Sequence, residues 1–137
     1  MSNLRKFDDQ ISVCGQITAE TVADLPAQGV TMLINNRPDG EDPGQPAAGD
    51  IEAAAERAGL AYRHIPIIRG MGPADVAAMA QAIDQADGGK VLAFCRSGNR
   101  SALVSALARR RQGIAQATIE KQLIDAGVDP SPIRHLL

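Results

Sequence analysis

Short apolar runs alternate with segments of helical periodicity along nearly the whole chain, and this alternation limits the possible folds strongly. Strands are predicted at residues 10–13, 30–34, 60–68 and 90–94. Helices are predicted at residues 18–29, 51–58, 73–86, about 101–111 and about 116–126, with a tail at 129–132. Strands that alternate with helices imply βαβ units. We therefore expect an α/β fold with a mostly parallel sheet that is flanked by helices on both faces.

The size of the chain predicts one domain over residues 1–137, with no linker or internal repeat. Hydrophobic residues make up 45% of the sequence, but only three of them are Tyr or Phe and none is Trp. The core must therefore consist mainly of Ala, Leu, Ile, Val and Met side chains.

Charge and apolar patterning exclude several classes of partner and cofactor. The net charge is −2, so no basic surplus indicates nucleic-acid binding. No run of about 18 apolar residues predicts a membrane span, and the first residues lack the apolar stretch of a signal peptide. With two cysteines and no sign of secretion, we expect a reduced, cytoplasmic setting. Neither metal-ligand spacing nor a Gly-rich nucleotide loop is present, so no metal or cofactor is expected.

The loop that follows the last predicted strand carries the strongest chemical signal. It runs from Cys95 to Arg100 as Cys-Arg-Ser-Gly-Asn-Arg and leads into a predicted helix. Loop N–H groups and a helix N-terminus that converge on one thiol stabilise its thiolate form and bind anions. We therefore predict that Cys95 is a covalent nucleophile, and that Arg96, Ser97, Gly98, Asn99, Arg100 and Ser101 surround the bound anion.

An inert, buried cysteine is the alternative, and three features of the loop argue against it. Gly98 lies in mid-loop, where a tight turn requires a positive φ. Arg96 and Arg100 would not be tolerated unpaired at an apolar site. Ser101 is predicted to supply the N-cap of the following helix.

A second loop, from Arg37 to Pro46, leaves the carboxyl end of another predicted strand and should open at the same edge of the sheet. Its segment Arg37–Glu41 could orient a substrate, with Arg37 as an anion ligand, or support the Cys95 loop through ion pairs with Arg96 or Arg100. A solvated turn is the third alternative. Of the remaining candidates, His64 and Arg69 are predicted to be structural or surface residues, and Cys14 to be buried and inert.

The sequence resembles two protein families. The residues from Cys95 to Ser101 match the Cys-Arg-x-Gly-x-Arg active loop of rhodanese-like sulfurtransferases. From about Phe7 to Arg110, the segments Asn36–Glu41, Ala58–Tyr62 and Ile65–Pro66 together with the Cys95 loop resemble the small bacterial family called beta-lactamase hydrolase-like protein, phosphatase-like domain (DUF442). The resemblance implies a three-layer fold similar to that of cysteine-dependent tyrosine and dual-specificity phosphatases.

The resemblance implies two activities, and the sequence departs from the phosphatase pattern in two places. Phosphatases carry His-Cys-x5-Arg, whereas Phe94 replaces the His here and only four residues separate Cys95 from Arg100. They also use an Asp general acid, and the segment 67–72 offers none. On loop size we favour a sulfurtransferase that forms a Cys95 persulfide from a small anionic sulfur donor. The alternatives are a phosphatase that acts on a phosphate ester through a phosphocysteine, and an anion-binding module without turnover.

Overall fold

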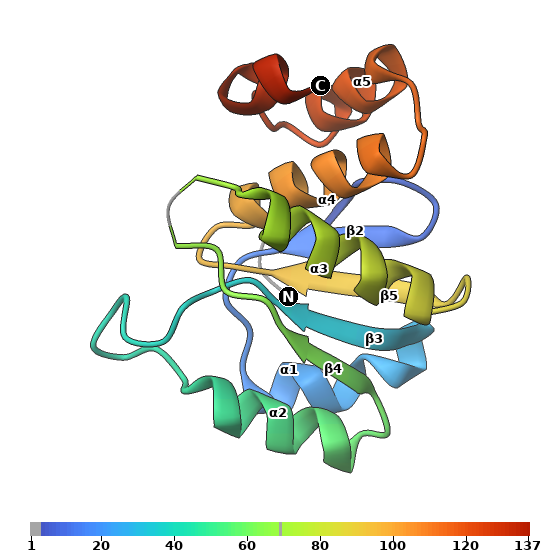
Figure 1. The fold of residues 1–137 in the computed structure, drawn as a ribbon. Coiled ribbons are helices and arrows are strands. Elements are labelled where there is room, and N and C mark those ends of the chain that lie inside the picture. The colour runs from blue at the N-terminus through green and yellow to red at the C-terminus, as the bar shows by residue number, and fades with distance from the viewer. Residues whose placement is uncertain (1–3, 69) are drawn as a thin grey trace.

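The computed structural model describes residues 4–68 and 70–137, and within them five strands form one sheet (Figure 1). The strands are β1 (Arg5–Lys6), β2 (Ile11–Cys14), β3 (Val30–Asn35), β4 (Ala61–His64) and β5 (Lys90–Phe94). Their order across the sheet is β1-β2-β5-β3-β4. The pairs β2·β5, β5·β3 and β3·β4 are parallel, and only β1 runs antiparallel to its neighbour β2. The prediction of a mostly parallel sheet is therefore confirmed.

Helices cover both faces of the sheet, which gives three layers (Figure 1). The helices are α1 (Ala19–Asp24), α2 (Ala48–Arg57), α3 (Pro73–Gln85), α4 (Asn99–Arg111) and α5 (Gln116–Asp125), with 3₁₀ turns η1 (Pro26–Gln28) and η2 (Ser131–Leu136). Helices α1 and α2 lie on one face, and α3 and α4 lie on the other, where α5 and η2 pack outside α4. The predicted α/β layering is confirmed.

The strands divide the core into two clusters, because successive side chains of a strand point to opposite faces. In β3, Leu33 joins the cluster under α1 and α2, while Met32 and Ile34 join the cluster under α3 and α4. Helix α4 is buried continuously from Ser101 to Ala108, because it lies between the sheet and α5. The loop before α4 is therefore joined to the most enclosed part of the molecule.

The first helix is shorter than its sequence pattern suggests. Thr18 is its N-cap as predicted, since its hydroxyl accepts a hydrogen bond from the N–H of Thr21 at 3.2 Å. The α-helix ends at Asp24 rather than at Gly29, because Pro26 has no N–H to continue the helical ladder. The chain continues as η1 and turns at Gly29, where φ is +85°.

Other element boundaries also differ from the predictions. The strand predicted to reach Ile68 ends at His64, because its partner strand β3 ends at Asn35, the residue opposite His64. Strand β1 was not predicted, since two residues show no periodicity. The predicted tail at 129–132 instead leads into η2.

Among the residues described, no helix combines the length and the apolar character needed to cross a membrane.

Candidate active site

Three connections leave the same edge of the sheet and form the candidate site: residues 95–98 after β5, residues 36–47 after β3, and residues 65–68 after β4 (Figure 1). The first two of these were predicted to share one opening, and they do. Glu41 and Asp42 of the second connection form ion pairs with Arg100 and Arg96 respectively. The carboxyl edge of the parallel strands is also where ligands bind in open α/β sheets.

Cys95 follows β5 directly and is fully buried (0% exposed). Its backbone N–H donates to the carbonyl oxygen of Cys14 at 3.3 Å, which ties the start of the loop to β2. Its Sγ accepts a hydrogen bond from the N–H of Gly98 at 3.0 Å. Gly98 has φ of +95°, which turns its N–H back toward the sulfur and lets α4 begin at Asn99. A residue with a Cβ would be strained at this φ.

The predicted N-cap at Ser101 is wrong. Helix α4 begins two residues earlier, and its N-cap position is held by Gly98. Ser101 therefore lies inside the first helical turn, fully buried, and its hydroxyl donates to Oδ1 of Asn36 at 2.8 Å. The side chain joins α4 to the end of β3 instead of closing the helix terminus.

Arg100 is held by the β3–α2 connection. Its Nη1 and Nη2 donate to Oε2 and Oε1 of Glu41, each at 2.8 Å, and Nη1 also donates to the carbonyl oxygen of Ile67 at 2.8 Å. The pKa of Arg100 is raised, first by its hydrogen bonds to Glu41 and further by the nearby Cys95 sulfur. The guanidinium therefore lies beside the thiol, and Glu41 and the Ile67 carbonyl fix its orientation.

Arg37 supports the Glu41–Arg100 pair through contacts of its own. Its side chain is only 4% exposed, and its three guanidinium nitrogens donate to Glu41 (2.9 Å), Gln16 (3.0 Å) and Asp42 (2.6 Å). Hydrogen bonds from Arg100 and then Arg37 lower the pKa of Glu41 to about 2. These contacts agree with one of the three alternatives for the segment Arg37–Glu41, namely that it supports the Cys95 loop through ion pairs. A direct contact of Arg37 with an anion stays a prediction.

The remaining loop residues point to different neighbours. Arg96 is 66% exposed, and its Nε lies 3.3 Å from Oδ2 of Asp42. The Ser97 hydroxyl accepts from the N–H of Asn99 at 3.3 Å. Arg5 of β1 donates to the Ser97 carbonyl oxygen at 2.9 Å and to Oδ1 of Asn99 at 3.3 Å. Sequence reasoning missed Arg5, because it lies 92 positions before Ser97 in the chain.

Asn36 was also missed, although it joins the β3–α2 connection to the end of β5, to the residue after β4 and to α4. Its backbone N–H donates to the Phe94 carbonyl at 2.8 Å, and its Nδ2 donates to the Ile65 carbonyl at 3.0 Å. Its Oδ1 accepts the Ser101 hydroxyl. An amide side chain directly after a buried strand was the available signal, since a buried amide must find partners for each of its polar atoms.

The secondary candidates lie at the margin of the site. His64 Nε2 is 2.9 Å from the carbonyl oxygen of Arg37. Cys14 is buried as predicted, and burial, followed by the nearby Cys95, raises its pKa to about 12. Asp75 lies in the first turn of α3 and accepts from the N–H of Gly72 at 3.2 Å. Arg69 lies outside the described residues.

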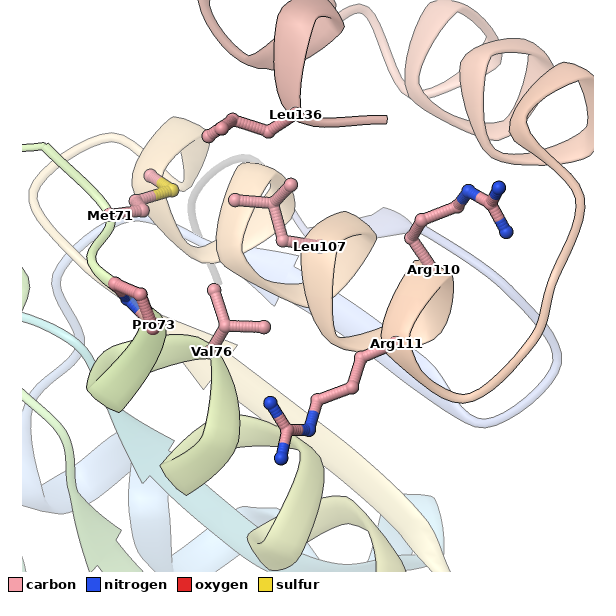
Figure 2. A pocket seen from close by; sticks show the side chains of 7 residues that line it. All are labelled: Met71, Pro73, Val76, Leu107, Arg110, Arg111 and Leu136. Carbon is pink, nitrogen blue, oxygen red and sulfur yellow. The ribbon is translucent and has the colours of Figure 1, made fainter.

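A separate groove of about 290 Å³ runs between α3, α4 and η2 (Figure 2). Its apolar lining includes Met71, Val76, Leu107 and Leu136, and Cys95 is not part of it. Within residues 4–68 and 70–137, no group of three or more His, Cys, Asp or Glu side chains is placed to hold a metal ion.

Comparison with known proteins identifies the family. Residues 3–112 match the family described as "Beta-lactamase hydrolase-like protein, phosphatase-like domain". The chain belongs to this family. A beta-lactamase hydrolase-like protein from Xylella fastidiosa (strain Temecula1 / ATCC 700964) is 37% identical over 102 residues, which are 74% of this chain and 23% of that protein. The chain thus spans about a quarter of the length of the curated relatives that it matches.

Two solved structures illustrate the likeness of fold. A presumed phosphatase from Neisseria meningitidis Z2491 has 31% sequence identity and a TM-score of 0.78, with 99% of this chain and 96% of that chain covered. The kinase-associated phosphatase, whose catalytic residue is a cysteine, has 16% identity and a TM-score of 0.71, with 94% and 83% covered, and shows the likeness of fold alone. Neither the family description nor these structures support the sulfur transfer that the sequence analysis ranked first.

Proposed function

We propose that this chain is a cysteine-dependent phosphatase that acts on phosphate monoesters. The observation that carries the proposal is the combination at one thiol of the Gly98 N–H, 3.0 Å from Cys95 Sγ, with an Arg100 guanidinium held by both oxygens of Glu41. A preoriented guanidinium and loop N–H groups are what a phosphoryl transition state requires, because its negative charge spreads over three equatorial oxygens. The likeness of the fold to phosphatases supports the same assignment.

In the first step, the Cys95 thiolate attacks phosphorus. A sulfur–phosphorus bond forms, the ester phosphorus–oxygen bond breaks, and its electron pair leaves on the alcohol oxygen, which takes a proton from solvent water. In the second step, water attacks phosphorus and gives up one proton to solvent, the sulfur–phosphorus bond breaks, and inorganic phosphate and the thiolate are released. Arg100 binds the equatorial oxygens in both steps, and the N–H of Gly98 stabilises the thiolate that enters and leaves the cycle.

The leaving group limits the range of substrates. The segment 67–72 contains no Asp or Glu, and Asp75 is engaged by the Gly72 N–H. Without a general acid from this segment, an alkoxide has to draw its proton from solvent, whereas a phenolate departs readily. We therefore expect aryl phosphates to be hydrolysed much faster than alkyl phosphates.

Sulfur transfer is the second candidate, and the length of the loop favours it. Four residues separate Cys95 from Arg100, one fewer than in the phosphatase pattern, and the missing residue removes one N–H donor from the ring. A single sulfane sulfur on Cys95 needs fewer donors than a phosphoryl group. In this alternative the thiolate attacks the sulfane sulfur of thiosulfate, sulfite departs with the bonding electrons, and a nucleophile later removes the sulfur.

Side-by-side assays of one protein preparation separate the two candidates. An aryl phosphate tests the phosphatase, and thiosulfate with cyanide tests the sulfurtransferase. The proposal predicts aryl phosphatase activity that Cys95→Ser abolishes and that Cys14→Ala, the matched change at the other buried cysteine, retains. Thiocyanate formation that depends on Cys95, without phosphate release, would replace the proposed function with the second candidate.

A further inference from the structure

Arg5 reaches the Cys95 loop from the far edge of the sheet. It lies in β1, opposite Val13 of β2, and its guanidinium extends to the loop before α4. Its Nη2 donates to the carbonyl oxygen of Ser97 at 2.9 Å and to Oδ1 of Asn99 at 3.3 Å. Its Nη1 donates to the carbonyl oxygen of Ala126, just after α5, at 3.2 Å.

The Ser97 carbonyl belongs to the same peptide unit as the N–H of Gly98. A trans peptide is planar, with its C=O and N–H pointing in opposite directions. Arg5 holds the oxygen end of this unit, and Cys95 Sγ accepts from its N–H end at 3.0 Å. Fixing the carbonyl therefore fixes the direction of the N–H toward the sulfur. A cationic donor on the carbonyl also polarises the peptide and strengthens the hydrogen bond at its other end.

The space around Gly98 shows how close this contact is. A Cβ placed on Gly98 would lie 2.6 Å from Nη2 of Arg5. The guanidinium thus packs directly against the turn that presents the N–H, and the three residues from Ser97 to Asn99 are held in the one conformation that points it at Cys95.

We propose that Arg5 is a positioning residue for the Cys95 thiolate, acting through the Ser97–Gly98 peptide rather than by touching a substrate. The inference rests on the proposed role of Cys95 as a nucleophile, and it holds for either chemistry of that thiolate. The other charged and titratable groups near the thiol are Arg96 of the loop, paired with Asp42, Arg100 from α4, held by Glu41, and Cys14 from β2. A change at Arg5 removes none of these groups, but it does take away a positive charge that lowers the pKa of Cys14.

The test follows the alkylation of Cys95 by iodoacetamide across pH, with the modified residue located by mass spectrometry. Arg5→Met removes the charge and the donors but keeps much of the side-chain length. We expect the midpoint of its alkylation profile to rise by about one pH unit, as for the loss of one hydrogen bond that a charge strengthens. Lys6→Met is the matched control, because Lys6 is the neighbouring β1 residue and pairs only with exposed Asp9 among the described contacts; its profile should not move.

Arg5→Lys keeps the charge and is the second variant, in case Arg5→Met does not fold. A single ammonium cannot serve the Ser97, Asn99 and Ala126 acceptors together, so its midpoint should fall between those of the wild type and Arg5→Met. A folded Arg5→Met or Arg5→Lys protein with the wild-type profile would overturn the proposal and leave Arg5 as a tie between α5 and the loop. The readout needs no substrate, so a wild-type protein that lacks phosphatase activity refutes the proposed function without deciding the role of Arg5.

Discussion

Glu41 binds Arg100 through both of its carboxylate oxygens, each 2.8 Å from a guanidinium nitrogen. A two-point contact fixes the plane of the guanidinium as well as its position. Glu41 is in turn held by Nε of Arg37 at 2.9 Å. The loop after β3 thus supports Arg100 in the first turn of α4, the arginine that we propose binds the anion, and this dependence can be measured.

Replacing the carboxylate should weaken activity without touching the nucleophile. In Glu41→Gln, one oxygen becomes an NH₂ group that cannot accept from Arg100, so the guanidinium loses its fixed plane. We expect kcat/KM for an aryl phosphate to fall by about one order of magnitude, toward the lower range for the loss of one preorganised donor. Glu20→Gln on the exposed face of α1 is the matched control and should be unchanged. Equal activity in both variants would show that Glu41 does not orient Arg100.

The same carboxylate should make stability depend on pH in acid. The folded-state pKa of Glu41 is about 2, against an ordinary value of 4.5, chiefly because Arg100 and Arg37 hydrogen-bond its ionised form. A depressed pKa adds stability that is complete above 4.5 and is lost as the pH falls toward 2. The difference in unfolding free energy between the wild type and Glu41→Gln should therefore shrink over this range in urea titrations. A difference that stays constant from neutral pH to pH 2 contradicts the ion-pair assignment.

Arg100→Lys should not behave as a conservative change. Lysine carries the charge but offers a single ammonium in place of a planar fork, so it cannot serve Glu41, the Ile67 carbonyl and a phosphoryl group together. We expect activity to fall by about one to two orders of magnitude, with the fold retained. Steady-state kinetics beside circular dichroism make the comparison. Near-normal turnover in the Lys variant would show that the phosphoryl group does not depend on the Arg100 guanidinium for binding.

A comparison of Gly98→Ala with Gly59→Ala separates the strain of a positive φ from a steric clash. The new methyl group would lie 2.6 Å from Arg5 Nη2 and 3.2 Å from the carbonyl carbon of Cys14. Gly59→Ala is the matched change, because φ there is +77° and no atom lies within 4 Å of the added Cβ. Gly59→Ala should cost about 1–2 kcal/mol for the left-handed conformation alone. Gly98→Ala should cost more than this in chemical denaturation and should slow Cys95 alkylation, and equal costs would mean that the loop around Gly98 has room to adjust.

The parts of the fold that the sequence predicts well are those set by local pattern. Strand β5 was predicted at its observed limits, because a run of buried apolar residues, Val91 to Phe94, is bounded by Lys90 and by the Cys95 loop. The shared opening of the Cys95 and Arg37–Pro46 loops was also predicted, since carboxyl ends of parallel strands lie at one edge. Both predictions need only the order and direction of the strands.

The parts that were missed depend on contacts between residues distant in sequence. Arg5 and Asn36 take their roles from partners in other elements, and neither lies in a motif that names those partners. The start of α4 was misplaced because a serine is a common N-cap, whereas tertiary contacts draw the Ser101 hydroxyl to Asn36. The ranking of the two activities followed the length of the loop, although the family resemblance already implied a phosphatase-like fold.

Rapid quench of the protein with an aryl phosphate, followed by mass spectrometry of the intact chain and of its Cys95 peptide, tests the central claim most directly. The account predicts a transient gain of one phosphoryl group on Cys95, absent in Cys95→Ser and prolonged in Arg100→Lys. No phosphoryl group on Cys95 at any time, together with a cyanide-removable sulfur atom there after incubation with thiosulfate, would contradict it.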